Sequence, residues 1–173
     1  AIQKNESIKN VYMIPGNAGS ARIKKCKRIF IDLNNKKELI EKLNFLKIEL
    51  VVIGPEIYLA NGLADFLREN NFKVFGPGKD GARLEYSKSW AKEFMKKANI
   101  PTAKFWKVGS LDDAKDIIES STLPLVVKAD GLASGKGVFI PNSKDECLKA
   151  SESIFNGKFG NSGNIVVLEE KIH

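Results

Sequence analysis

The segment from Pro124 to Ile140 constrains the fold more than any other part of this chain. An apolar run ends in Lys128, and a second apolar run, Val138–Ile140, follows a turn that contains three glycines and another lysine. Short apolar runs on either side of such a turn predict two β-strands joined by a loop. Glycines let backbone N–H groups approach an anion, and lysines neutralise its charge. The segment therefore predicts a β–loop–β unit that binds the phosphates of a nucleotide.

This loop differs from the two commonest phosphate-binding loops. A Walker A loop places four residues between its first glycine and the Gly-Lys pair. Here three residues separate Gly131 from Gly135, and Gly137 follows Lys136. The dinucleotide fingerprint needs a third glycine at the start of a helix, whereas Gly137 precedes an apolar run. An ordinary hairpin connection, with Lys128 as a solvated lysine at a strand end, is the alternative interpretation.

Apolar runs and helical spacings alternate over the first half of the chain. The expected strands are 11–14, 28–32, 50–53 and 73–75, and the expected helices are 36–46 and 59–69. This alternation predicts a Rossmann-like parallel sheet with helices on its faces. Such a unit normally opens with a strand and a ligand-binding turn. Because no such strand precedes residue 11, we expect the opening strand to lie outside this sequence.

The pattern changes in the second half. Ser87 is a candidate N-cap for a helix whose lysines, Lys88, Lys92, Lys96 and Lys97, are expected to face solvent. Expected strands at 104–108 and 165–168, and helices that begin after Ser110 and Ser143, accompany the glycine loop. Glycine and proline cluster near residues 76–83. We therefore expect one domain over 1–82 and a second over 83–173, with a small α+β lid at about 104–173.

Charge and composition exclude some classes of function. The net charge of +7 could indicate nucleic-acid binding, but the lysines are spread over every segment, so we expect no nucleic-acid partner. The sequence contains no apolar stretch of the roughly 20 residues that a membrane span needs. Cys26 and Cys147 lie far apart and have no metal-binding spacing. We expect a cytoplasmic monomer with two free thiols.

Segments along almost the whole chain resemble the ATP-grasp superfamily and, within it, the phosphoribosylamine–glycine ligase family. The matching segments are 15–21, 51–56, 75–77, 84–88, 100–103, 127–138 and 168–170. The string from Lys128 to Val138 is the most specific of them. The resemblance implies an α/β protein: a Rossmann-like pre-ATP-grasp domain without its first strand, then the first part of an ATP-grasp domain with its lid.

The resemblance also implies a reaction. ATP phosphorylates the carboxylate of glycine, and the amine of 5-phosphoribosylamine attacks the glycyl phosphate. The products are glycinamide ribonucleotide, ADP and phosphate, in de novo purine biosynthesis. The family's Mg²⁺ (or Mn²⁺) ligands lie beyond the end of this sequence, so we expect no metal ligand here and no activity of these 173 residues alone. Another ATP-grasp carboxylate–amine ligase and a noncatalytic nucleotide-binding module remain alternatives.

The site residues follow from the same resemblance. Those expected to contact ATP are Lys88, Lys128, Gly131, Ser134, Gly135, Lys136, Gly137, Glu169, Glu170, Lys171 and Ile172. In this set the glycine loop (residues 131–137) is the phosphate flap, and residues 169–172 form the adenine-side hinge. Those expected to bind 5-phosphoribosylamine are Gly16, Asn17, Gly54, Pro55 and Glu56. The latter five follow expected strands, where ligands bind in folds of this kind.

Overall fold

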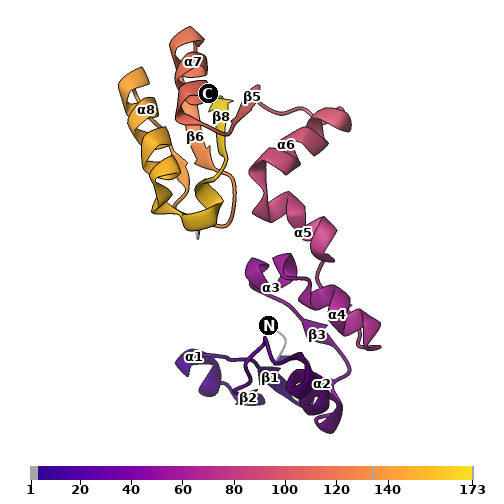
Figure 1. Cartoon of the computed structure of the whole chain (residues 1–173). Helices are drawn as coiled ribbons and strands as arrows, with labels where there is room; N and C mark the ends of the chain where they lie inside the picture. The colour runs from indigo at the N-terminus through magenta and orange to yellow at the C-terminus, as the bar shows by residue number, and fades with distance from the viewer. Residues whose placement is uncertain (1–3, 134, 173) are drawn as a thin grey trace. The chain divides into compact units, whose positions relative to one another are not determined.

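The computed structural model describes residues 4–133 and 135–172 (Figure 1). The chain divides into two compact units. The first comprises residues up to Val51 together with Asn70–Lys73, and the second comprises Val52–Glu69 and the residues from Val74 onward. The domain boundary expected near residue 82 stays a prediction.

The first unit contains a pair of parallel strands. In chain order its elements are β1 (Val11–Met13), α1 (Ala18–Ala21), β2 (Cys26–Arg28) and α2 (Lys36–Phe45). The register pairs Val11 with Cys26 and Met13 with Arg28. The strand expected at 28–32 therefore lies earlier in the sequence. The pairing ends where Ile29 N donates to Met13 O, because β1 stops before a turn at Pro15, which has no N–H to continue the ladder.

The next elements are β3 (Val51–Val52), α3 (Glu56–Ala60), α4 (Leu63–Glu69), β4 (Val74–Phe75) and α5 (Lys79–Tyr86). The helix expected at 59–69 is two helices, because Gly62 has a positive φ of 76° and interrupts it. Strands β3 and β4 pair with each other. The parallel sheet expected for the first half is thus two separate two-stranded sheets within the described residues. Leu59, Ala64 and Ala82 form a small core.

The rest of the second unit contains an antiparallel sheet. Its elements are α6 (Lys88–Lys97), β5 (Phe105–Val108), α7 (Leu111–Ser120), β6 (Leu125–Ala129), β7 (Val138–Phe139), α8 (Lys144–Ser153), the π-helical turn η2 (Ile154–Lys158), the 3-10 turn η3 (Gly160–Gly163) and β8 (Val166–Glu170). The strand order is β5–β8–β6–β7. Strands β6 and β7 are the pair predicted on either side of the glycine loop, and they pair antiparallel.

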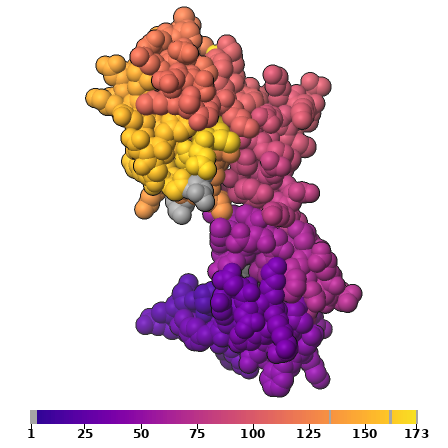
Figure 2. Space-filling model, viewed as in Figure 1, coloured from indigo at the N-terminus to yellow at the C-terminus, as the bar shows by residue number. Residues whose placement is uncertain are grey.

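The two faces of this sheet have different environments. Leu125, Val127 and Leu168 on one face are buried against α7 and α8. Residues of these two helices form much of the surface that this part of the chain presents in Figure 2. The register pairs Val126 with Glu169 and Lys128 with Val167. Because side chains alternate along a strand, Lys128 and Glu169 share the opposite face. That face carries the candidate site.

Cys26 and Cys147 are free cysteines. Within residues 4–133 and 135–172, none of the helices is both long and apolar enough to cross a membrane.

Candidate nucleotide-binding site

The start of α6 is tied to the glycine loop through Asp130. Ser87 caps the helix as predicted, because its side chain accepts a hydrogen bond of 3.3 Å from Trp90 N. Asp130 follows β6 directly, and its carboxylate accepts hydrogen bonds of 2.5 Å from Ser89 N and 3.2 Å from Ser87 Oγ. A carboxylate at a helix N-terminus satisfies free N–H groups and interacts favourably with the helix dipole. No local sequence signal identifies this role of Asp130, because its partner Ser89 lies 41 residues away.

Lys88, the first residue of α6, lies at the base of the loop. Its amine donates to the backbone oxygens of Asp130 (3.5 Å) and Gly131 (3.2 Å). Burial lowers the pKa of Lys88 from its ordinary 10.5; Asp130 and Glu85 act in the opposite direction, while the Lys128 charge lowers it further. A half-buried ammonium with another cation nearby favours an anionic ligand, whose charge would raise this pKa again.

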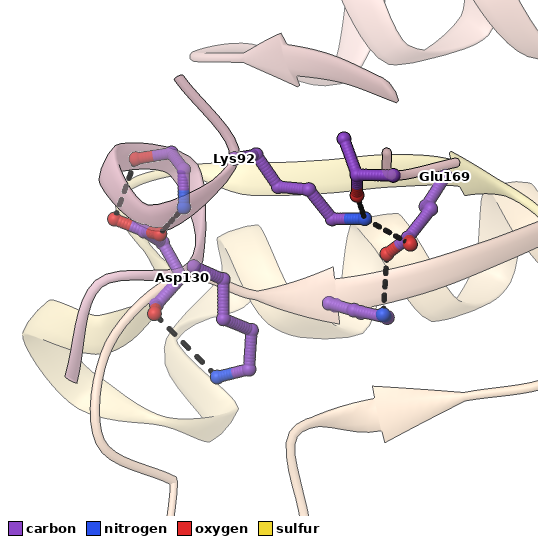
Figure 3. Close-up of polar contacts among 7 residues, drawn as sticks. Lys92, Asp130 and Glu169 are labelled. Carbon is purple, nitrogen blue, oxygen red and sulfur yellow. Dashed lines mark hydrogen bonds and ion pairs between the residues drawn. The ribbon is translucent and has the colours of Figure 1, made fainter. Parts of the chain in front are cut away.

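Lys128 and Glu169 form an ion pair on the sheet face described above. The Lys128 amine bonds to Glu169 Oε2, and the amine of Lys92 bonds to Glu169 Oε1. Figure 3 shows the amine of Lys92 beside the Glu169 carboxylate. Burial raises the pKa of Glu169, but the hydrogen bonds and charges of Lys128 and Lys92 outweigh it and hold the pKa below its ordinary 4.5. Glu169 is therefore ionised at neutral pH.

Lys92 corrects one prediction made from the sequence. Its position on α6 predicted a solvated lysine, but Lys92 is 9% exposed and turns toward Glu169. Its amine also donates to Thr102 Oγ1 at 2.6 Å. Lys96, by contrast, is exposed as expected. The partner of Lys92 lies 77 residues away, so no local signal identifies it.

The glycine loop is closely packed at its base and open at its tip. A Cβ on Gly131 would lie 2.6 Å from Ser162 Oγ, and one on Gly137 would lie 2.6 Å from the Cβ of Ala133. Gly135 has φ +75° and open space around it, and Lys136 is exposed. Ser134, also predicted to contact ATP, lies outside the described residues. The packed glycines fix the ends of the loop, while its tip has space for a ligand.

The predicted hinge residues differ in their positions. Glu169 and Glu170 belong to β8, which extends beyond the expected 165–168, and their side chains alternate between the two faces of the sheet. Glu170 Oε1 lies 3.7 Å from Lys104 Nζ. The backbone N–H of Lys171 donates to Pro124 O at 2.9 Å, and Ile172 is 74% exposed. Glu169 thus lies on the face of Lys128, whereas Glu170 points to the other face.

The residues expected to bind 5-phosphoribosylamine lie in turns. Asn17 caps α1, and its Oδ1 accepts a 2.8 Å hydrogen bond from Ser20 N. Gly16 has φ +67°, and a Cβ there would meet three side-chain atoms at 3.0 Å. Gly54 has open space around it, Pro55 is the N-cap of α3, and Glu56 is exposed. The segments 16–17 and 54–56 belong to different compact units.

A metal site is absent from the described part of the chain. Among residues 4–133 and 135–172, His, Cys, Asp and Glu side chains form no group of three that could hold an ion. The carboxylates of Glu169 and Asp130 do not fit a divalent cation, because they already accept bonds from lysine and from the start of α6.

The antiparallel sheet, its glycine loop and the lysines at the base of that loop define a protein of the ATP-grasp class. Solved structures of this class share the fold. The biotin carboxylase domain of Hydrogenobacter thermophilus 2-oxoglutarate carboxylase matches with a TM-score of 0.73 and 21% identity, over 95% of this chain and 39% of that one. Bacillus anthracis D-alanine–D-alanine ligase matches with a TM-score of 0.67 and 21% identity, over 95% and 57%. At these identities the likeness concerns the fold alone.

Family comparisons are more specific. Residues 1–85 match the family described as "Phosphoribosylglycinamide synthetase, N domain", and residues 86–173 match its "ATP-grasp (A) domain". The chain is 40% identical over 167 residues to phosphoribosylamine–glycine ligase of Nostoc sp., covering 96% of this chain and 39% of the relative. The corresponding Thermotoga maritima structure matches with a TM-score of 0.68 and 35% identity, over 95% of this chain and 38% of that one. This chain belongs to the phosphoribosylamine–glycine ligase family, and it spans about 40% of the length of these relatives.

Proposed function

We propose that this chain supplies the glycine loop and the phosphate-binding lysines of an enzyme that joins glycine to 5-phosphoribosylamine. The reaction consumes ATP and gives glycinamide ribonucleotide, ADP and phosphate, a step of purine biosynthesis. The observation that carries the proposal is the pair of lysines at the base of the glycine loop. Lys88 donates to Gly131 O, and Lys128 lies near the end of β6, the strand that leads into the loop.

The reaction needs a phosphoryl group to pass from ATP to the glycine carboxylate. Negative charge then develops on the transferring group, and positioned cations stabilise it. Lys88 and Lys128 supply two such charges from different elements, α6 and β6. The glycyl phosphate must then be shielded from water until the amine attacks. The open tip of the glycine loop, with Gly135 and Lys136, suits closure over the phosphates.

The second substrate is assigned to the turns after β1 and β3. We propose that Gly16 and Asn17, together with Gly54, Pro55 and Glu56, bind 5-phosphoribosylamine. The open space around Gly54 supports this role, because a ligand can approach the backbone closely there. Mg²⁺ or Mn²⁺ would be held by ligands outside this chain, and none of the steps above uses it. We further propose a cytoplasmic monomer that binds no nucleic acid.

The test uses the complete protein encoded by the open reading frame that contains this chain. ADP release is measured with ATP, glycine and 5-phosphoribosylamine, and then without glycine. We expect glycine-dependent ADP release in the wild type and its loss in Lys128→Met. Lys149→Met is the matched control, because Lys149 is an exposed lysine of α8, which packs on the opposite face.

Three results would contradict the proposal. ADP release that does not depend on glycine indicates another ATP-grasp ligase, whose preferred acceptor substrate would identify it. ATP binding without turnover indicates a noncatalytic nucleotide-binding module. Equal activity of Lys128→Met and Lys149→Met would remove Lys128 from the site.

A further inference from the structure

Glu169 is a buried carboxylate shared by two lysines that differ in access to solvent. The Lys128 side chain is 24% exposed, whereas the side chains of Lys92 and Glu169 are each 11% exposed. Lys92 is also held by the hydroxyl of Thr102 at 2.6 Å. Of the two amines bonded to this carboxylate, the Lys128 amine is therefore the more accessible to a ligand, and Lys92 is enclosed.

The charges of these three side chains are unequal. Two ammonium groups and one carboxylate carry a net charge of +1, so the group retains attraction for an anion. A ligand phosphate would compete with Glu169 for the amine of Lys128. Glu169 Oε2 would then lose its hydrogen bond from Lys128. A buried carboxylate that loses a charged partner pays a large desolvation penalty unless a second cation remains bound to it. Lys92, on Oε1, is that second cation.

We propose that Lys92 is a positioning residue that keeps Glu169 paired while Lys128 moves from Glu169 to the phosphates of the nucleotide. This inference rests on the proposed binding of ATP at the glycine loop. Lys92 touches no ligand in this scheme. It lowers the cost of releasing Lys128, and it holds Glu169, the first residue of the predicted hinge, in place on β8. The role is specific for ligands that carry phosphates, because adenosine has no phosphate for Lys128 to bind.

A purely structural role for Lys92 makes a different prediction. If Lys92 only connects α6 to β8, replacing it would lower the affinity for every ligand by the same factor, in proportion to the loss of stability. If Lys92 is a positioning residue, replacing it lowers the affinity for ATP more than the affinity for adenosine. The positioning effect also depends on the charge of Glu169, since Glu169→Gln removes the negative charge that attracts the amine of Lys128.

The experiment uses the complete protein and compares the Kd of ATP, from calorimetry, with the Kd of adenosine, from competition against ATP. For Lys92→Met we expect ATP affinity to fall by about tenfold or more, as for loss of one partner of a buried charge pair. Adenosine affinity should change by less than about threefold. Lys92→Arg, which keeps the charge, should retain most of the ATP affinity. In a Glu169→Gln background, the effect of Lys92→Met on ATP should nearly disappear.

Equal losses for ATP and adenosine, or an undiminished loss in the Glu169→Gln background, would overturn the inference. The Glu169→Gln, Lys92→Met double variant leaves no unpaired carboxylate, so it serves where Lys92→Met alone fails to fold. Failure of the proposed function has a separate signature. A wild type that binds ATP without glycine-dependent turnover overturns the proposed reaction, whereas the ratio of the two affinities still decides the role of Lys92. A wild type that does not bind ATP overturns both.

Discussion

The carboxylate of Asp130 accepts a hydrogen bond of 2.5 Å from the backbone N–H of Ser89. This hydrogen bond joins the start of α6 to the residue that follows β6, and its two partners are 41 residues apart in the sequence. The labelled Asp130 in Figure 3 lies at the start of this helix. Because the glycine loop begins at the next residue, this contact fixes the loop relative to the helix that carries Lys88 and Lys92.

Asp130→Ala should therefore destabilise the protein by about 1.5–3 kcal/mol, the usual cost of losing a hydrogen bond to a charged group. Asp130→Asn keeps an oxygen that can accept from Ser89 N, so it should cost less. Urea denaturation measures these differences. The control is Asp145→Ala at the start of α8, which should cost less because Asp145 is exposed, whereas Asp130 is partly buried. Equal denaturation midpoints for Asp130→Ala and Asp145→Ala would contradict a stabilising bond between Asp130 and the start of α6.

The stability of the protein should fall in acid partly through Glu169. Its pKa is lower in the folded state than the ordinary 4.5. A carboxyl group of this kind stabilises the fold above its unfolded pKa and loses this contribution as the pH falls through the folded pKa. We expect the wild type to lose stability relative to Glu169→Gln below pH 4.5, and urea midpoints across that range measure the difference. Parallel pH profiles would show that folding does not lower the pKa of Glu169.

Replacing a glycine by alanine should cost more stability at the base of the loop than in an open turn. A Cβ on Gly137 would lie 2.6 Å from the Cβ of Ala133 and 3.2 Å from that of Ala129. Gly137→Ala should thus cost about 1–3 kcal/mol, as overpacking of a close contact does. Gly109, around which the structure leaves open space, is the control, and Gly109→Ala should change stability by less than about 0.5 kcal/mol. Similar denaturation midpoints for the two variants would contradict the packing described for the loop.

The affinity for ATP should decrease at alkaline pH through Lys88. Because burial lowers its pKa below 10.5, Lys88 loses its charge at a lower pH than an exposed lysine, and the neutral amine attracts phosphate less. Lys88→Arg stays charged throughout this range. Its ATP affinity should fall less steeply with pH than that of the wild type, as calorimetric titrations of the complete protein would measure. Identical slopes would exclude Lys88 from the phosphate site.

The sequence predicted the elements whose signals are local. The strands on either side of the glycine loop, the cap at Ser87 and the start of α8 after Ser143 are confirmed. Each depends on residues within a few positions of one another. The ATP-grasp fold was predicted from the resemblance of these motifs to that superfamily, and the string from Lys128 to Val138 is the most specific of them.

Predictions that depended on distant partners were less successful. Lys92 has the sequence context of a solvated lysine, and its burial depends on Glu169 in another element. The extent of β2 depends on where β1 ends, and the break at Gly62 depends on a positive φ that a helical apolar pattern conceals. Glu169 and Glu170 were both placed in the hinge, and alternation along β8 directs their side chains to opposite faces of the sheet. Their contact with ATP stays a prediction.

Lys128 and the glycine loop are proposed to bind the phosphates of ATP. The most direct measurement follows the backbone amide resonances of the complete protein during titration with ATP and, separately, with adenosine. We predict that ATP shifts the amides of Lys128, Gly135 and Gly137 far more than adenosine does, while that of Lys149 stays unchanged. Amides of the loop that do not respond to ATP, or that respond equally to adenosine, would contradict the claim.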